Sequence, residues 1–148
     1  MNDSLTVRDL HPGETEPARL FLSQHGWGHR IGDAESFARL IHNSQRTAVA
    51  LLGEQIVGFA RAITDEVSNG YLSMVVVDDQ HRRKGIGRAL VEYVMGDNPD
   101  ITWVLRAGRE GAEAFSPAWA SRPQSLPWNV SAANSAQWKN PDHQTVAP

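Results

Sequence analysis

The sequence contains no cysteine among its 148 residues. Disulfide bonds, thiolate metal sites and a covalent cysteine intermediate are therefore excluded. It also has no apolar run near the length of about 18 residues that indicates a membrane span. The net charge is only −3, so a broad basic surface for nucleic acid is not expected. We therefore expect neither a membrane nor a nucleic acid as partner.

Size and composition are those of an ordinary soluble domain. The chain of 148 residues is long enough for one domain with a hydrophobic core, and 41% of its residues are hydrophobic and 21% charged. Its first residues, MNDSLTVRDL, lack the basic and apolar regions of a signal peptide, so a cytoplasmic protein is expected.

Residues 70–96 hold the most informative pattern: an apolar strand, an acidic turn, a basic loop and an amphipathic helix follow one another directly. Residues 71–77 are apolar and β-branched at their end, which predicts a strand buried on both faces. Apolar residues then recur at helical spacing from Ile86 onward, and Gly96 stands where a helix C-terminal glycine is expected.

The loop between this strand and this helix is rich in glycine and basic residues. Gly85 and Gly87 carry no Cβ, so a ligand can lie against the backbone. Because the loop opens a helix, its N–H groups and the helix dipole favour a phosphate. Cationic side chains add to this attraction, namely Arg82, Arg83, Lys84 and Arg88. A single G-x-G and a basic run also occur on solvated surfaces, which is the alternative.

Two common phosphate motifs do not fit this loop. The P-loop has four residues between its glycines and a following Lys-Ser/Thr, and the dinucleotide fingerprint has a third glycine and a later acidic residue. The sequence RRKGIG at residues 82–87 instead matches the pattern Arg/Gln-x-x-Gly-x-Gly/Ala. With its flanking strand and helix it resembles the acetyl-CoA-binding motif of the GNAT superfamily of N-acetyltransferases.

The order of the other elements is similar to the GNAT fold as far as Phe115. Periodicity and turn residues predict strands at 5–8, 46–52, 55–63, 71–77 and 101–105, and helices at 14–24, 33–42, 86–95 and 110–115. The resemblance implies an α/β (α+β) acetyltransferase domain over residues 1–115. Its mixed, mostly antiparallel twisted sheet would be flanked by helices, with the fourth and fifth strands splayed.

The resemblance also implies how acetyl-CoA would bind as cosubstrate, without a metal. The pantetheine arm would lie between the fourth and fifth strands and pair with the backbone of Val75, Val76 and Val77. One N–H group of this strand would polarise the thioester carbonyl. The pyrophosphate would be held by the loop residues Arg82, Arg83, Lys84, Gly85, Ile86, Gly87 and Arg88.

The implied acceptor is a primary amine of a small molecule or a peptide. An aliphatic amine has a pKa near ~10.4, so a proton must be removed before it attacks. In the family the loop between the first two helices borders the acceptor, and here it holds His25, Trp27 and His29. Trp27 and His29 are candidates for substrate contact, and His29 also for catalysis. Solvated histidines and a packed tryptophan are the alternative that the sequence favours.

Asp65 and Glu66 follow the third strand and are further catalytic candidates, since either could attract a cationic amine. Turn residues in water are the simpler interpretation of both. Family members often carry a Glu on the fourth strand, where this chain offers only Ser73. The sequence therefore assigns no general base.

Residues 116–148 differ in character from the rest of the chain. They hold three of the five tryptophans and neither Phe nor Tyr. They show no helix or strand period, so an atypical tail is expected that is coil, disordered or packed on a partner. The resemblance implies a last strand here, which we expect to be missing or supplied by a partner chain. Ser116 stands where the family commonly has a Tyr that protonates the CoA thiolate.

A frameshift explains this tail, and the genetic code tests it. If one nucleotide was lost just after the codon of Phe115, the junction of Trp119 and Ala120 must have encoded Gly. The junction of Trp128 and Asn129 must have encoded Glu. Other junctions permit a sequence that resembles the family's C-terminal strand in order and spacing. A genuine divergent tail is the alternative, and resequencing the coding DNA decides between them.

Three functional hypotheses follow from the sequence. The leading one is a GNAT-type N-acetyltransferase. The second is an acetyl-CoA-binding protein of the same fold whose altered C-terminus impairs catalysis. The third is a nucleotide or nucleic-acid binder that uses the basic loop. The acceptor and the oligomeric state, a homodimer included, stay open.

Overall fold

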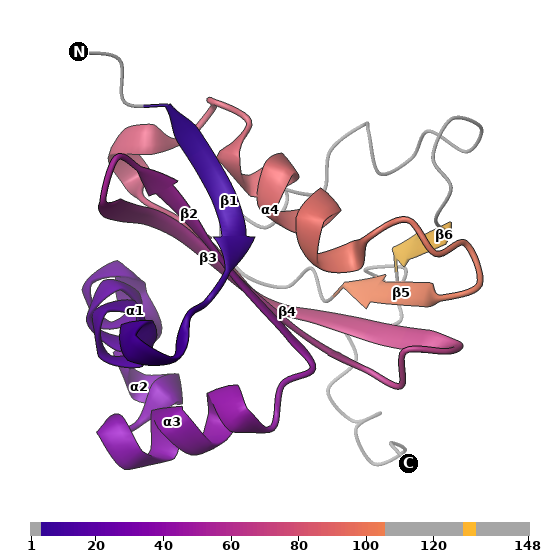
Figure 1. The fold of residues 1–148 in the computed structure, drawn as a ribbon, viewed down its shortest axis with the longest axis horizontal. Helices are drawn as coiled ribbons and strands as arrows, with labels where there is room; N and C mark the ends of the chain where they lie inside the picture. The colour runs from indigo at the N-terminus through magenta and orange to yellow at the C-terminus, as the bar shows by residue number, and fades with distance from the viewer. Residues whose placement is uncertain (1–3, 106–128, 133–148) are drawn as a thin grey trace, which may run out of the picture.

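The computed structural model describes residues 4–105 and 129–132. Over these residues the chain forms one twisted sheet with helices on both faces (Figure 1). The strands are β1 (Leu5–Asp9), β2 (Arg46–Leu52), β3 (Gln55–Thr64), β4 (Asn69–Val77), β5 (Thr102–Leu105) and β6 (Asn129–Ala132). The main helices are α1 (Thr15–Leu22), α2 (Gly28–Ile31), α3 (Ala34–His42) and α4 (Ile86–Met95). None of the helices in this part of the chain is long and apolar enough to cross a membrane.

The strands lie side by side in the order of the sequence, from β1 to β6. The pairs from β1 to β4 are antiparallel, whereas β5 runs parallel to β4 and β6 parallel to β5. Between β4 and β5 the chain crosses over through α4, as a parallel connection requires. The predicted fold class, a mixed and mostly antiparallel sheet flanked by helices, is confirmed.

Each face of the sheet has its own hydrophobic core. One core lies under α4 and contains Leu90, Val94 and the almost fully buried Trp103. Gly58 of β3 belongs to this side, because a Cβ there would stand 2.7 Å from the Leu90 Cδ1 atom. The other core lies under α1 and α3 and contains Phe37 and other apolar side chains. The basic loop at residues 82–88 thus opens a helix whose inner face is anchored in this core.

Most predicted elements lie where periodicity placed them. α3 begins after Asp33, whose carboxylate accepts the Ser36 N–H at 2.8 Å and so caps the helix. α4 ends at Met95 and is followed by Gly96, whose φ of 66° is one that glycine adopts readily. β2 has the predicted bounds, Arg46–Leu52. Local sequence signals therefore predicted these ends correctly.

One local expectation was wrong in part. The segment 25–30 is a loop only at its start: the turn η2 (Ser23–Trp27) has non-helical backbone angles at His25 and at Gly26, where φ is 87°, and the short helix α2 follows. Glycine tolerates this positive φ, so the chain kinks at Gly26. The strand at 71–77 places side chains in both hydrophobic cores, as expected: Leu72, Val75 and Val77 lie on the α4 side, and Met74 and Val76 on the other.

The C-terminal tail is described only in part. The predicted helix at 110–115, Ser116 and the proposed domain boundary lie outside the described residues. The expectation of coil throughout 116–148 is wrong for β6, which pairs with β5 from Thr102↔Asn129 to Leu105↔Ala132. Residues 129–132 therefore cover the outer edge of β5 within this chain.

Candidate functional site

The fourth strand contains a β-bulge at Met74, whose φ is 55°. Pairing with β3 shifts there, from Arg61↔Ser73 before the bulge to Phe59↔Val76 after it. A bulge inserts one residue that the partner strand does not match, which bends the strand and increases its twist. A positive φ is uncommon for a residue with a side chain, so the surrounding pairing must hold Met74 in place.

The bulge changes which side chains of β4 point to each face. Before it, Leu72 packs in the core under α4. After it, Val76 packs in the core under α1 and α3, while Val75 and Val77 contact the α4 side. Strict alternation from Leu72 would have put Val76 on the α4 side, so the one extra residue reverses the faces. Val75 and Val77 therefore line the side on which the basic loop lies.

Beyond the bulge, β4 has an edge that β5 does not pair. Parallel pairing with β5 extends only from Asn69↔Thr102 to Leu72↔Leu105. Residues 73–77 continue past the end of β5, and in the part of the chain that the structure describes no strand pairs with this edge. Backbone N–H and C=O groups on such an edge can bind an extended ligand as a further strand would.

The basic loop follows directly and leads into α4. Gly85 has φ 79°, and a Cβ placed there would meet nothing within 4 Å. The first hydrogen bond of α4 runs from the Ala89 N–H to the Gly85 carbonyl at 3.0 Å. The amides of Ile86 and Gly87 precede that bond, so they have no acceptor within the helix. Open backbone and helix N-terminal amides together form a place for a phosphate group.

The four cationic side chains of this loop are not equivalent. Arg82 pairs with Asp79 at 2.7 Å, and Arg88 pairs with Glu92 at 2.8 Å. Arg83 and Lys84 are exposed and take part in none of the ion pairs found among the described residues. Arg83 also has φ 66°, so the loop turns sharply at this residue. Arg83 and Lys84 are therefore the cations with most charge available for an anionic ligand.

A polar cluster that the sequence did not predict supports the start of this loop. Asp78 lies between two histidines, with its Oδ1 3.7 Å from His25 Nε2 and its Oδ2 3.4 Å from His81 Nδ1. The Gln80 N–H, which bonds to the carboxylate at 3.0 Å, and both histidines lower the pKa of Asp78. The cluster connects η2 to the end of β4. In the sequence, the Asp-x-x-His spacing of Asp78 and His81 was the one feature that could have indicated this cluster.

The residues expected at the acceptor side are placed differently from one another. Trp27 is half-buried against the core under α1 and α3, and the guanidinium of Arg30 lies 6.0 Å from its ring centre. His29 is exposed on α2. His25 points inward, with Nδ1 2.7 Å from the Phe21 carbonyl oxygen. The structure thus brings His25, rather than His29, to the loop.

Asp65 and Glu66 lie at the end of β4 that is far from this loop, and both carboxylates already accept hydrogen bonds. The Asp65 carboxylate accepts three N–H groups of residues 67–69 and the Ser68 hydroxyl, which hold its pKa far below the usual range. Glu66 has φ 64° and accepts two bonds from Arg46, at 2.6 and 3.2 Å. Both carboxylates therefore organise the turn between β3 and β4.

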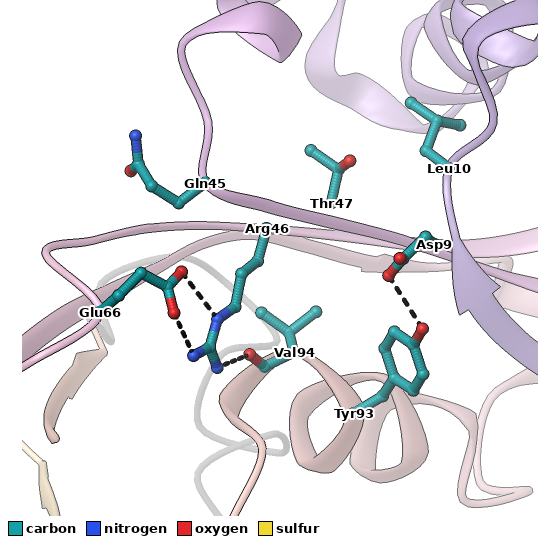
Figure 2. Close-up of a pocket in the computed structure, with 8 residues that line it drawn as sticks. All are labelled: Asp9, Leu10, Gln45, Arg46, Thr47, Glu66, Tyr93 and Val94. Carbon is teal, nitrogen blue, oxygen red and sulfur yellow. Dashed lines mark hydrogen bonds and ion pairs between the residues drawn. The ribbon is translucent and has the colours of Figure 1, made fainter. Parts of the chain in front are cut away.

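A hollow of about 470 Å³ also lies at this far end (Figure 2). It is lined by Asp9, Leu10, Gln45, Arg46, Thr47, Glu66, Tyr93 and Val94. Arg46 binds the Val94 and Met95 carbonyls at 2.8 and 2.9 Å, and the Tyr93 hydroxyl bonds to Asp9 at 2.8 Å. The hollow adjoins the C-terminal end of α4. At 1.5 Å per residue, it is about 15 Å along the helix from the basic loop. It is therefore separate from the loop and the open strand edge.

No group of histidine and acidic side chains that could hold a metal ion occurs within residues 4–105.

Comparisons with known proteins agree with this geometry. The model of the acetyltransferase (GNAT) family matches residues 8–98. No curated protein sequence matches the chain significantly. The fold is similar to a GNAT family acetyltransferase from Streptococcus pneumoniae TIGR4, with TM-score 0.63, 20% identity, and coverage of 74% of this chain and 80% of that one.

Two further solved structures have a similar fold. An aminoglycoside acetyltransferase from an uncultured soil metagenomic sample has TM-score 0.61 and 25% identity, with coverage of 83% of this chain and 95% of that one. A ribosomal-protein-alanine N-acetyltransferase from Brucella melitensis biovar Abortus 2308 has TM-score 0.61 and 16% identity, with coverage of 76% and 88%.

Proposed function

The chain belongs to the GNAT family of acetyltransferases, and on that premise we propose that it transfers the acetyl group of acetyl-CoA to a primary amine of a small molecule or a peptide. One observation carries the proposal. The edge of β4 at residues 73–77, which no strand of the described residues pairs, leads directly into a helix N-terminus with an open glycine loop. A thioester arm followed by a pyrophosphate fits these two features in that order.

The proposed contacts of acetyl-CoA come mainly from the backbone. Val75, Val76 and Val77 offer N–H and C=O groups to the pantetheine amides. Main-chain amides from 82 to 88 hold the pyrophosphate, and the space over Gly85 lets phosphate oxygens approach the chain. Arg83 and Lys84 supply the positive charge, because Arg82 and Arg88 already have carboxylate partners. A cytoplasmic location belongs to the proposal, since acetyl-CoA is a metabolite of the cell interior.

The proposed reaction needs three things from the protein: stabilisation of the charge on the carbonyl oxygen, removal of a proton from the amine, and a proton for the leaving thiolate. The amine nitrogen attacks the thioester carbon, the C–S bond breaks, and the sulfur leaves as a thiolate that takes up a proton. A backbone N–H near the bulge at Met74 would stabilise the negative charge on the carbonyl oxygen. The amine must also lose a proton. We assign this step to neither Asp65 nor Glu66, because both carboxylates already accept hydrogen bonds from other residues of the chain.

Two other functions are weighed against this one. An acetyl-CoA-binding protein with impaired catalysis is favoured by Ser116, which stands where the family commonly has its tyrosine acid. A nucleic-acid binder has less support, because only Arg83 and Lys84 of the basic loop keep uncompensated charge in the part of the chain that is described. Such a short basic stretch makes few phosphate contacts.

Calorimetric titration with acetyl-CoA tests the proposed site. We expect one molecule to bind per chain, and we expect the double variant Arg83→Glu/Gly85→Glu to lose binding, because it places two carboxylates where the pyrophosphate would lie. The matched control is Arg39→Glu/Gly13→Glu, in which the arginine is exposed on α3 and the glycine faces open space. Unchanged affinity in the first variant would refute the site.

Thiol release from acetyl-CoA across a panel of amines separates catalysis from binding alone. Because the chain has no cysteine, a thiol reagent reports only the CoA product. Amine-dependent release supports the transferase. Binding without release supports the impaired protein, and ATP or DNA binding that survives excess CoA supports the third function.

A further inference from the structure

A half-buried arginine on β3 has no carboxylate partner in the described part of the chain. Arg61 donates from Nε to the Ser44 hydroxyl at 2.6 Å and from Nη1 to the Ser73 hydroxyl at 3.3 Å. No Asp or Glu among the described residues forms an ion pair with it. Burial lowers the pKa of Arg61, and Tyr71 is the one neighbour that favours its charge. The second terminal nitrogen, Nη2, makes none of the hydrogen bonds found here.

A charge taken out of water without an opposite charge is costly, so buried arginines are normally paired. The two serine hydroxyls accept hydrogen bonds, but neither carries a negative charge. They do hold the guanidinium in one orientation, and Ser44 is itself fixed by its bond to the Leu40 carbonyl at 2.7 Å. A planar guanidinium held in this way keeps the N–H donors of Nη2 and the second N–H of Nη1, and these suit a carboxylate, which can accept two parallel hydrogen bonds.

Arg61 lies beside the bulge and on the face of the sheet opposite α4. Its pairing partner Ser73 directly precedes Met74. At about 3.3 Å per residue, Ser73 is about 7 Å along the strand from Val75. The phosphates would lie at the N-terminus of α4, on the other face. A second substrate would therefore approach the thioester from the face that carries Arg61 and Ser73.

This face is not fully covered by helices. Ile63, which follows Arg61 on the same side of β3, has 42% of its surface exposed. Tyr71, which pairs with Ile63, is only half-buried. The contacts of α1 and α3 are with the other end of this face, around Phe37 and Phe59. Arg61 thus lies at the border between a packed core and an open surface.

We propose that Arg61 binds a carboxylate on the acceptor, so that the acceptor is an amine that also carries a carboxylate, such as an amino acid. The inference rests on the proposed acetyl transfer. Ser44 and Ser73 position the guanidinium, and the carboxylate on Nη2 orients the amine toward the thioester beside the bulge. An acceptor without an anionic group would leave the charge of Arg61 uncompensated.

Matched acceptors test the proposal. Three pairs differ in the carboxylate alone: leucine and isopentylamine, phenylalanine and phenethylamine, and lysine and cadaverine. For the wild type we expect KM to be at least about tenfold lower for the member with the carboxylate, since charge-assisted hydrogen bonds are among the stronger ones. Arg61→Gln should remove this preference. Arg61→Lys keeps the positive charge but cannot form two parallel hydrogen bonds to a carboxylate, so it should keep only part of the preference for the carboxylate-bearing acceptor.

The control is Arg39→Gln, the same change at an exposed arginine on α3. Comparing the ratio of the two KM values between wild type and variant cancels the difference in basicity of the amines. A purely structural role of Arg61 would instead lower kcat for all acceptors alike. Equal KM values within each pair, or a preference for polycationic aminoglycosides that Arg61→Gln leaves unchanged, would overturn the proposal.

A binding experiment separates failure of this inference from failure of the proposed function. N-acetyl-leucine and its amide are titrated by NMR into the protein saturated with CoA, which requires no turnover. We expect the acid to bind at least about tenfold more tightly than the amide in the wild type and equally in Arg61→Gln. If CoA itself does not bind, the proposed function fails. If CoA binds and the acid has no advantage, as when a carboxylate of the chain itself occupies Arg61, the inference fails.

Discussion

The indole ring of Trp103 lies directly against the backbone of Gly70. The two residues are paired in the parallel ladder between β4 and β5, and a Cβ at Gly70 would stand 2.4 Å from the ring atom Cζ3. Trp103 is only 1% exposed, so its ring has no room to move aside. This contact holds β5 to the first half of β4. The second half keeps an edge that no strand of the described residues pairs, and we propose this edge as part of the cofactor site.

Gly70→Ala should therefore destabilise the protein by about 1–3 kcal/mol, the range for overpacking a filled core. The measurement is the free energy of unfolding from denaturant titration. Gly13→Ala is the control, because a Cβ at Gly13 meets nothing within 4 Å. Equal stability of the two variants would show that Trp103 is not packed as described.

Arg46 joins three elements, since it binds Glu66, the last carbonyls of α4 and the face of the Trp103 ring at 5.4 Å. Arg46→Ala should lower the free energy of unfolding by about 2–3 kcal/mol, because it leaves helix C-terminal carbonyls and a turn carboxylate without their donor. Arg39→Ala, at an exposed site on α3, should change stability by less than about 0.5 kcal/mol. A loss at Arg46 as small as that at Arg39 would contradict this account.

The pair of Arg8 and Glu14 makes stability depend on pH. Two hydrogen bonds from Arg8, at 2.7 and 2.8 Å, lower the pKa of Glu14 to about 2. A carboxyl with a depressed pKa stabilises the fold above its unfolded pKa, and this contribution is lost as the pH falls through the folded pKa. The difference in Tm between wild type and Glu14→Gln should therefore be full at pH 6 and shrink from about pH 4.5 toward pH 2. A difference that stays constant down to pH 2 would be inconsistent with this pairing.

The part of the site that is local in sequence could be predicted. The glycines and basic residues of the loop, and the helix that follows, depend on neighbours within a few positions, so residues 82–87 pointed to a phosphate site directly. Helix ends at Asp33 and Gly96 followed from capping chemistry for the same reason. The run of valines in β4 indicated burial on both faces, and the structure places these side chains in both cores.

The parts that depend on distant contacts could not be predicted. The bulge at Met74 exists only through pairing with β3, and methionine gives no local signal for a positive φ. The cluster at Asp78 needs His25, which reaches it through the kink at Gly26. Arg61 lies in a segment predicted only as a strand, and the fold alone shows that it meets Ser44 and Ser73 and no carboxylate among the described residues.

Restoring the reading frame tests the origin of the C-terminal tail. Reinserting an A after the first base of the Ser116 codon should return a tyrosine where Ser116 now stands. We expect turnover of acetyl-CoA to rise by at least ~10²-fold, the lower range for general acid catalysis. Equal turnover of the two proteins, or relatives that share the present tail, would remove the frameshift explanation.

Amide hydrogen exchange with and without acetyl-CoA tests the central claim most directly, because it locates the ligand on the backbone. We expect slower amide exchange on acetyl-CoA binding at residues 75–77 and at Ile86 and Gly87. The amides of Ile86 and Gly87 precede the first hydrogen bond of α4. Amides around the hollow at the other end of that helix, such as Arg46 and Thr47, should not change. Protection at the hollow with none at residues 75–77 and the loop would contradict the assignment of the cofactor site.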